Sequence, residues 1–100
     1  MKTDTVDGAL APALTKWDLC VLAATPLEPE PWTIEALRAT WLSTWRIAEA
    51  LREEDVKYVR QTLRGLEDRG LVRSSPHWEL HRKRWLRTRE GDRYLEKAQP

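Results

Sequence analysis

The segment from Asp55 to Gly70, DVKYVRQTLRGLEDRG, constrains the fold more than any other stretch of the chain. At about 100° per residue, its apolar side chains fall on one narrow stripe of a helix. They are Val56, Val59, Leu63 and Leu66. Asp55 can cap the first turn by accepting a hydrogen bond from a free backbone N–H, and Gly70 can take the left-handed conformation that closes a helix. The segment therefore predicts a helix with a core face and a polar face.

Length and composition predict one domain. A chain of 100 residues can bury a modest core without disulfides or metal, and six tryptophans with no phenylalanine concentrate that core in a few large side chains. Residues 1–12 lack periodicity and are expected to form a disordered arm, followed by a folded domain over residues 13–98. The chain has a single cysteine, no apolar run near 18 residues and no signal peptide. We therefore expect a soluble cytoplasmic protein that does not enter a membrane.

The N-terminal half predicts three helices. Thr15 caps the first, and its Cys20 is expected to be a buried structural thiol rather than a redox sensor, because no base or second cysteine accompanies it. Three prolines make residues 25–31 a loop. Thr33 caps the second helix, and Ser43 or Thr44 caps a third that ends near Leu51. The alternative is one continuous helix over residues 34–52.

The C-terminal part predicts a small sheet and a last helix. Residues 71–73 form a short strand, and residues 77–80 pair with residues 84–87 in a hairpin. Its turn, His81 to Arg84, holds three full charges in four residues. Residues 73–100 carry eight basic and four acidic side chains, so positive charge gathers there. A helix over about residues 90–98 ends the domain.

The stretch TWRIAEALREEDVKYVRQTLRGLEDRGLV resembles the core of winged helix-turn-helix transcription regulators of the MarR, PadR and ArsR kind, and WLRTREGDRYL resembles their closing strand and last helix. The resemblance implies a mainly α fold with a small β-hairpin (α+β): four to five helices and a two- to three-stranded wing. Two departures stand out. Leu51 and Val59 are eight residues apart, where the families usually have seven and often a glycine turn. Arg87 stands where they commonly have leucine.

The polar face of the central helix carries side chains that can read base edges in a major groove. Gln61 can bond adenine in two places, and Lys57 and Arg64 can donate to guanine. Tyr58 can contact a thymine methyl group or a phosphate, although it can also simply cover the flank of the helix. Similar polar residues occur on any solvated helix.

Phosphate contacts are expected at two other places. Thr44 and Arg46 open the preceding helix, where free N–H groups and the helix dipole favour an anion. Arg82, Lys83 and Arg84 lie where the resemblance places the wing, against the minor groove or its phosphates. Acidic residues oppose this interpretation, because they precede or share the reading helix. They are Glu53, Glu54, Asp55 and Asp68.

We predict a DNA-binding transcription regulator that binds double-stranded DNA, acts as a repressor by occupying its operator, and is nucleoid-associated when bound. The resemblance implies a homodimer. No catalytic constellation, phosphate-cradling loop or cofactor site is present in the sequence, so we predict no enzyme. His77 and His81 would lie about 13 Å apart on a strand, so no metal site is expected. The alternative is a protein-interaction module, favoured if Trp32, Trp41 or Trp85 forms an exposed patch with Tyr94. A small viral or plasmid regulator could do both.

Overall fold

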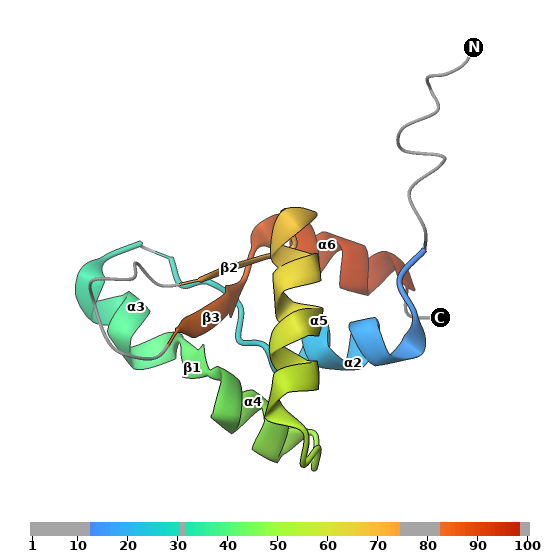
Figure 1. Ribbon diagram of the computed structural model, residues 1–100. Coiled ribbons are helices and arrows are strands. Elements are labelled where there is room, and N and C mark those ends of the chain that lie inside the picture. The colour runs from blue at the N-terminus through green and yellow to red at the C-terminus, as the bar shows by residue number, and fades with distance from the viewer. Residues whose placement is uncertain (1–12, 31, 75–82, 99–100) are drawn as a thin grey trace.

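A computed structural model describes residues 13–30, 32–74 and 83–98 of the chain. Within these ranges the protein is of the mixed α+β class, with five helices and a three-stranded antiparallel sheet. The helices are α2 (Lys16–Ala24), α3 (Ile34–Thr40), α4 (Thr44–Ala50), α5 (Val56–Asp68) and α6 (Arg89–Ala98). The strands are β1 (Leu42–Ser43), β2 (Val72–Ser74) and β3 (Arg84–Arg87). Helix α5 is central and packs against α2, α4 and β2 (Figure 1).

The sheet has the order β1-β3-β2, with β3 in the middle. Trp85 pairs with Leu42 on one side and with Ser74 on the other, and Arg87 lies opposite Val72. The prediction that β3 pairs with residues 77–80 is therefore wrong, because β1 and β2 occupy its two sides. Residues 77–80 lie outside the described part of the chain.

The predicted helix starts are confirmed by side-chain caps. The hydroxyls of Thr15, Thr33 and Ser43 each accept a backbone N–H three residues further on, and Asp55 caps α5 in the same way. The alternative of one helix over residues 34–52 is wrong. Trp41 is extended (φ −67°, ψ 150°), and the next two residues pair with β3 in the sheet, so their backbone cannot continue the helix.

Helices α4 and α5 end in the same left-handed turn. After α5, Gly70 has φ +77°, its N–H donates to the Glu67 carbonyl, and the next N–H reaches back to Leu66. After α4, Arg52 has φ +57°, and the same two bonds run to Glu49 and Ala48. This is the Schellman motif, which satisfies carbonyls left free at a helix end. The turn after α4, which has Arg52 instead of a glycine, thus keeps the geometry that a glycine usually provides.

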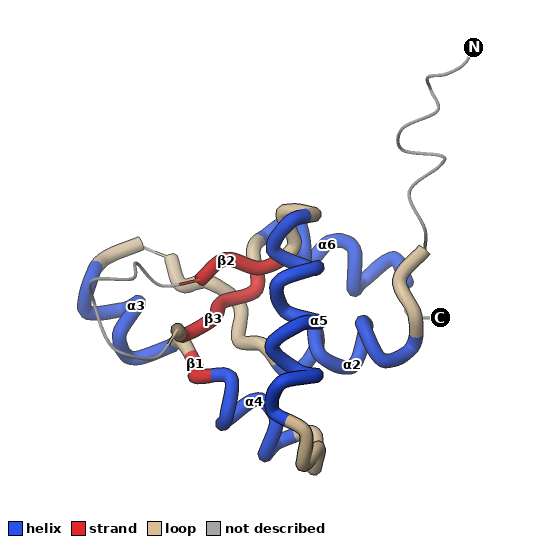
Figure 2. Tube along the Cα trace, in the orientation of Figure 1, coloured by secondary structure: helices blue, strands red, loops and turns tan. Residues whose placement is uncertain are grey.

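Two hydrophobic clusters adjoin the sheet, and the helices that contribute to them, α3 for one and α5 for the other, lie on different sides of the strands (Figure 2). The main cluster joins α2, α4, α5 and α6, and Trp85 of β3 is fully buried within it. The indole N–H of Trp85 donates to the Thr44 hydroxyl at 2.8 Å. On the other face, Leu86 packs with Leu37 and Trp41 at the end of α3. Alternation along β3 explains why its two apolar residues serve different clusters.

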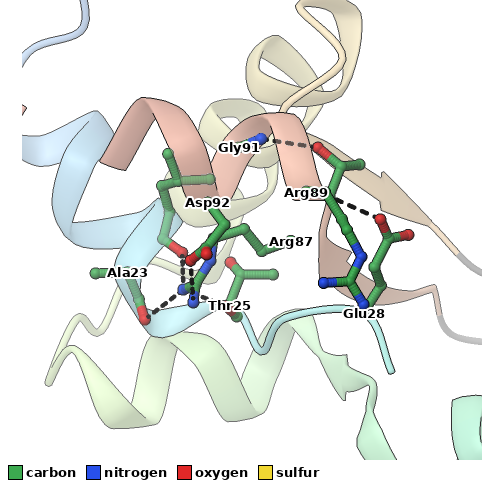
Figure 3. A network of polar contacts seen from close by, with 9 residues as sticks. Ala23, Thr25, Glu28, Arg87, Arg89, Gly91 and Asp92 are labelled. Atoms are coloured by element: carbon green, nitrogen blue, oxygen red, sulfur yellow. Dashed lines mark hydrogen bonds and ion pairs between the residues drawn. The ribbon is translucent and has the colours of Figure 1, made fainter. Parts of the chain in front are cut away.

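Arg87 ties three elements together (Figure 3). Its Nη1 donates to the carbonyls of Leu22, Ala23 and Thr25 at the end of α2, at 3.0 to 3.3 Å. Its Nη2 lies 3.0 Å from Asp92 Oδ1 in α6. The position at which the families that the sequence resembles commonly carry leucine is therefore a polar junction in this chain.

Helix α6 begins against the end of the turn that follows α5. The Thr88 hydroxyl donates to the Gly70 carbonyl and accepts the Gly91 N–H, which caps the helix. A Cβ atom at Gly91 would lie well inside van der Waals contact of the Leu71 carbonyl oxygen. This close approach requires glycine.

Cys20 is exposed, so the prediction of a buried thiol is wrong. Val21 and Leu22 fill the core side of α2 instead. None of the helices in the described ranges has the length and apolar character needed to cross a membrane.

Candidate nucleic-acid interface

The outer face of α5 carries the four side chains predicted to read DNA bases. Lys57, Tyr58, Gln61 and Arg64 are all exposed, while Val59, Leu63 and Leu66 are buried. The division follows from the stripe of apolar residues, which turns the opposite face to solvent.

Tyr58 also has a structural contact. Its ring stacks on Trp17 of α2, with ring centroids 5.0 Å apart and planes 4° apart, and the Trp17 indole N–H donates to Thr62 Oγ1 at 2.8 Å. One face of the Tyr58 ring is therefore covered by Trp17 of α2, and 45% of Tyr58 stays exposed.

An open hollow of about 710 Å³ lies between the start of α4, one flank of α5 and the residue that precedes β3. It is lined by Ser43, Thr44, Trp45, Val56, Arg60, Arg64 and Lys83. Three of these residues are basic and none is acidic, so the hollow favours an anion. It brings one of the predicted base-reading residues and one predicted wing residue into the same site.

Arg60 is a member of this site that the sequence analysis missed. It is exposed, and it precedes Arg64 by one turn on the same flank of α5. The missed signal was the four-residue spacing of two arginines at the edge of the apolar stripe.

Of the three residues predicted to form the tip of the basic turn, Lys83 and Arg84 lie in different environments. Arg82 lies outside the described residues. Lys83 is exposed, with its Nζ 5.6 Å from the centroid of the Trp85 ring. Arg84 is the first residue of β3, which confirms the predicted strand over residues 84–87. It is half-buried and pairs with Ser43, so its assignment to the turn as well is wrong. Alternation along the strand directs Lys83 toward α5 and Arg84 toward the opposite face of the sheet.

The two residues predicted to contact phosphate at the start of α4 also lie in different environments. Thr44 is buried, and its hydroxyl accepts the Trp85 indole N–H, so this side chain supports the core. Arg46 is exposed and lies 4.0 Å from Glu49 on the same helix, at the surface. Its backbone N–H is already bonded to Ser43.

Two of the acidic residues that precede α5 have local roles. Glu53 Oε2 accepts the Asp55 N–H at 3.0 Å, and Asp55 Oδ1 accepts the Tyr58 N–H at 3.2 Å. The carboxylates therefore satisfy donors at the start of the helix, where the dipole favours negative charge. Glu54 and Asp68 are exposed.

Gln61 lies beside a different depression, of about 220 Å³, on the α2 side of α5. Its lining includes Leu14, Asp18 and Arg69. The exposed face of α5 thus borders two hollows, and the one next to Gln61 has mixed charge.

The residues predicted to form the exposed aromatic patch of a protein-interaction module do not form one. Trp41 and Trp85 are buried, and Tyr94 is partly buried against the main cluster. Trp32 is exposed, but it donates to Glu28 at 3.3 Å and lies under Arg73 at 5.3 Å. Trp45, which was not predicted to be exposed, lines the basic hollow.

Neither a protein-family model, nor a curated protein, nor a solved structure matches this chain. What this surface can bind is therefore inferred from its own residues. In the described part of the chain, no group of three or more His, Cys, Asp or Glu side chains is placed to hold a metal ion, and His77 and His81 lie outside that part. The strongest feature is an open cationic hollow beside an exposed helix face, which suits a polyanion.

Proposed function

We propose that the protein is a winged helix-turn-helix regulator that binds double-stranded DNA. In this proposal α4 and α5 form the helix-turn-helix, β2 and β3 flank the wing, and α5 lies in the major groove. The observation that carries the proposal is the hollow that Arg60 and Arg64 of α5 line together with Lys83. A duplex that touches α5 would bring its phosphates to all three cations at once.

The exposed face of α5 supplies donors and acceptors for base edges. Gln61 can pair with adenine and Lys57 can donate to guanine. Arg64, predicted from the sequence to read guanine, is assigned here to phosphate because it lines the hollow with Arg60 and Lys83. Arg60, on the flank nearest Lys83, is assigned to phosphate. The carboxylates of Glu53 and Asp55 each accept a backbone N–H at the start of α5, but they keep their negative charge and count against this arrangement.

We further propose that the protein acts as a repressor by occupying its operator, and as a homodimer on two half-sites. Half-sites read by two copies of α5 would lie about one helical turn, roughly 34 to 36 Å, apart. Analytical ultracentrifugation with and without operator DNA measures this stoichiometry directly.

The test measures DNA affinity against salt concentration, after selection of bound sequences from a random duplex library. Arg60→Ala, Arg64→Ala and Lys83→Ala should each weaken binding and reduce the slope of log K against log salt by about 1, because each removes one phosphate contact. If Arg64 reads a base instead, its variant should relax sequence preference and keep the slope. Gln61→Ala should also relax sequence preference, by about 1 to 3 kcal/mol at its base pair.

Arg93→Ala is the matched control, because Arg93 is an exposed arginine on α6 and does not line the hollow. It should keep wild-type affinity and slope. Wild-type behaviour of all three hollow variants, or no binding to any duplex at low salt, would contradict the proposal.

Trp32 supports a second candidate, a protein-interaction role. It is 54% exposed and borders a depression with Glu30, Arg73 and Arg89. A tryptophan beside arginines is a frequent anchor of protein interfaces. Loss of a captured partner in Trp32→Ala, with DNA binding intact, would support this role.

A further inference from the structure

Trp45 also lines the hollow, and the proposed contacts between cations and phosphates give it no role. It is the second residue of α4 and is 53% exposed. The other tryptophans in the described ranges are buried or engaged: Trp41 and Trp85 in the clusters, Trp17 on Tyr58, and Trp32 on Glu28 and Arg73. Trp45 has no hydrogen bond or ring contact within those ranges. About half of a large apolar side chain is therefore open to solvent, in a hollow that three basic residues also line.

From this placement we infer that Trp45 packs against the deoxyribose rings of the DNA strand whose phosphates bind Arg60, Arg64 and Lys83. The inference rests on the proposed function and adds an apolar contact to it. Along a DNA strand, sugars alternate with phosphates, so a surface that follows the strand can contact both. The hollow offers both, with Trp45 and Val56 as apolar lining and the three cations around them.

The indole suits this place for a second reason. Tryptophan presents an apolar face and one N–H donor at its edge, so the same ring can cover a sugar and donate to the next phosphate oxygen. A fully paired duplex exposes sugars and phosphates along its strands but keeps its bases stacked inside. The contact therefore requires no distortion of the duplex.

The inference separates two parts of the affinity by their response to salt. Contacts between cations and phosphates release counterions and weaken as salt rises, whereas an apolar contact does not. Trp45→Ala should lower affinity for the selected duplex by about tenfold, by the same factor at every salt concentration, with an unchanged slope. Trp45→Phe should retain part of the affinity because it keeps an aromatic face.

Trp32→Ala is the matched control. Trp32 is exposed to nearly the same extent, 54% against 53%, but it lines a different depression. It should bind the duplex as the wild type does. Far-UV circular dichroism and thermal unfolding of Trp45→Ala should stay close to the wild type, because about half of the residue is exposed and it makes no hydrogen bond or ring contact within the described ranges.

A second measurement reads the contact without relying on affinity. Binding of the duplex should protect wild-type tryptophan fluorescence from quenching by acrylamide, a neutral quencher that the arginines do not attract. That protection should be lost in Trp45→Phe and kept in Trp32→Phe. Equal protection in both variants would overturn the inference.

The remaining outcomes separate the two proposals. If the wild type binds duplex DNA and Trp45→Ala binds equally well, the sugar contact is wrong and the proposed function stands. If the wild type prefers a duplex with one unpaired nucleotide, and Trp45→Ala loses that preference, Trp45 stacks on a base and the sugar contact is again wrong. If no duplex binds at low salt, the proposed function itself fails.

Discussion

Arg52 adopts at the end of α4 the conformation that Gly70 adopts at the end of α5. Its φ of +57° places it in the left-handed region, where an L side chain brings Cβ close to the following carbonyl oxygen. The surrounding backbone hydrogen bonds hold it there. The turn before the proposed reading helix thus keeps its shape at a cost in conformational energy.

Arg52→Gly should remove this cost. We expect the free energy of unfolding to rise by roughly 1 kcal/mol, measured by urea denaturation. Arg52→Ala is the control, since it removes the exposed charged side chain but keeps Cβ. Equal stability of the glycine and alanine variants would show that backbone strain at this position is negligible.

At the scale of elements, Arg87 of β3 caps the C-terminal end of helix α2. Helix α2 has no basic residue in its last turn, and the guanidinium of Arg87 bonds the carbonyls at that end while pairing with Asp92. A positive charge at a helix C-terminus is favourable. Because the Arg87 and Asp92 side chains are only 15% and 29% exposed, loss of one leaves the other poorly solvated.

Arg87→Leu should therefore destabilise the protein, although leucine is common at this position in the families that the sequence resembles. We expect a loss of about 2 to 4 kcal/mol in urea unfolding. Adding Asp92→Asn should cost less in the Arg87→Leu background than in the wild type, which a double-mutant cycle measures. A leucine variant as stable as the wild type would argue against the capping role.

At the scale of the whole molecule, the sheet separates two clusters of unequal size. The main cluster holds α2, α4, α5 and α6 together, whereas α3 packs through Leu37 and the adjoining Trp41 against Leu86. A helix held by a small cluster opens at lower free energy than one in the main core. The side of the molecule that carries α5 should accordingly be the more rigid one.

Native-state hydrogen exchange should show this difference. We expect amide protons of α3 to exchange at least about tenfold faster than those of α5. Trp41→Ala should speed exchange in α3 further and leave the core of α5 unchanged. Identical opening free energies for the two helices would show that the two clusters unfold as one unit.

Local patterns in the sequence were sufficient to predict the helix starts and the buried face of α5. The stripe of Val59, Leu63 and Leu66 was enough to orient α5, because periodicity of apolar residues decides which face is buried. Thr15, Thr33 and Asp55 marked helix starts for an equally local reason, since each side chain bonds a backbone N–H within one turn.

Tertiary structure decided the partners of β3, the burial of Thr44 and the position of Arg84. Each depends on residues far away in the sequence: β1 lies about forty residues before β3, yet it takes one side of it, and Trp85 turns the Thr44 hydroxyl inward. The grouping of Arg60, Arg64 and Lys83 in one hollow has the same origin. The sequence by itself determined where the helices begin and which face of α5 is polar, because those are short-range properties. Which charged and aromatic side chains share a site was decided by the packing of the sheet against α5, since only long-range contacts bring them together.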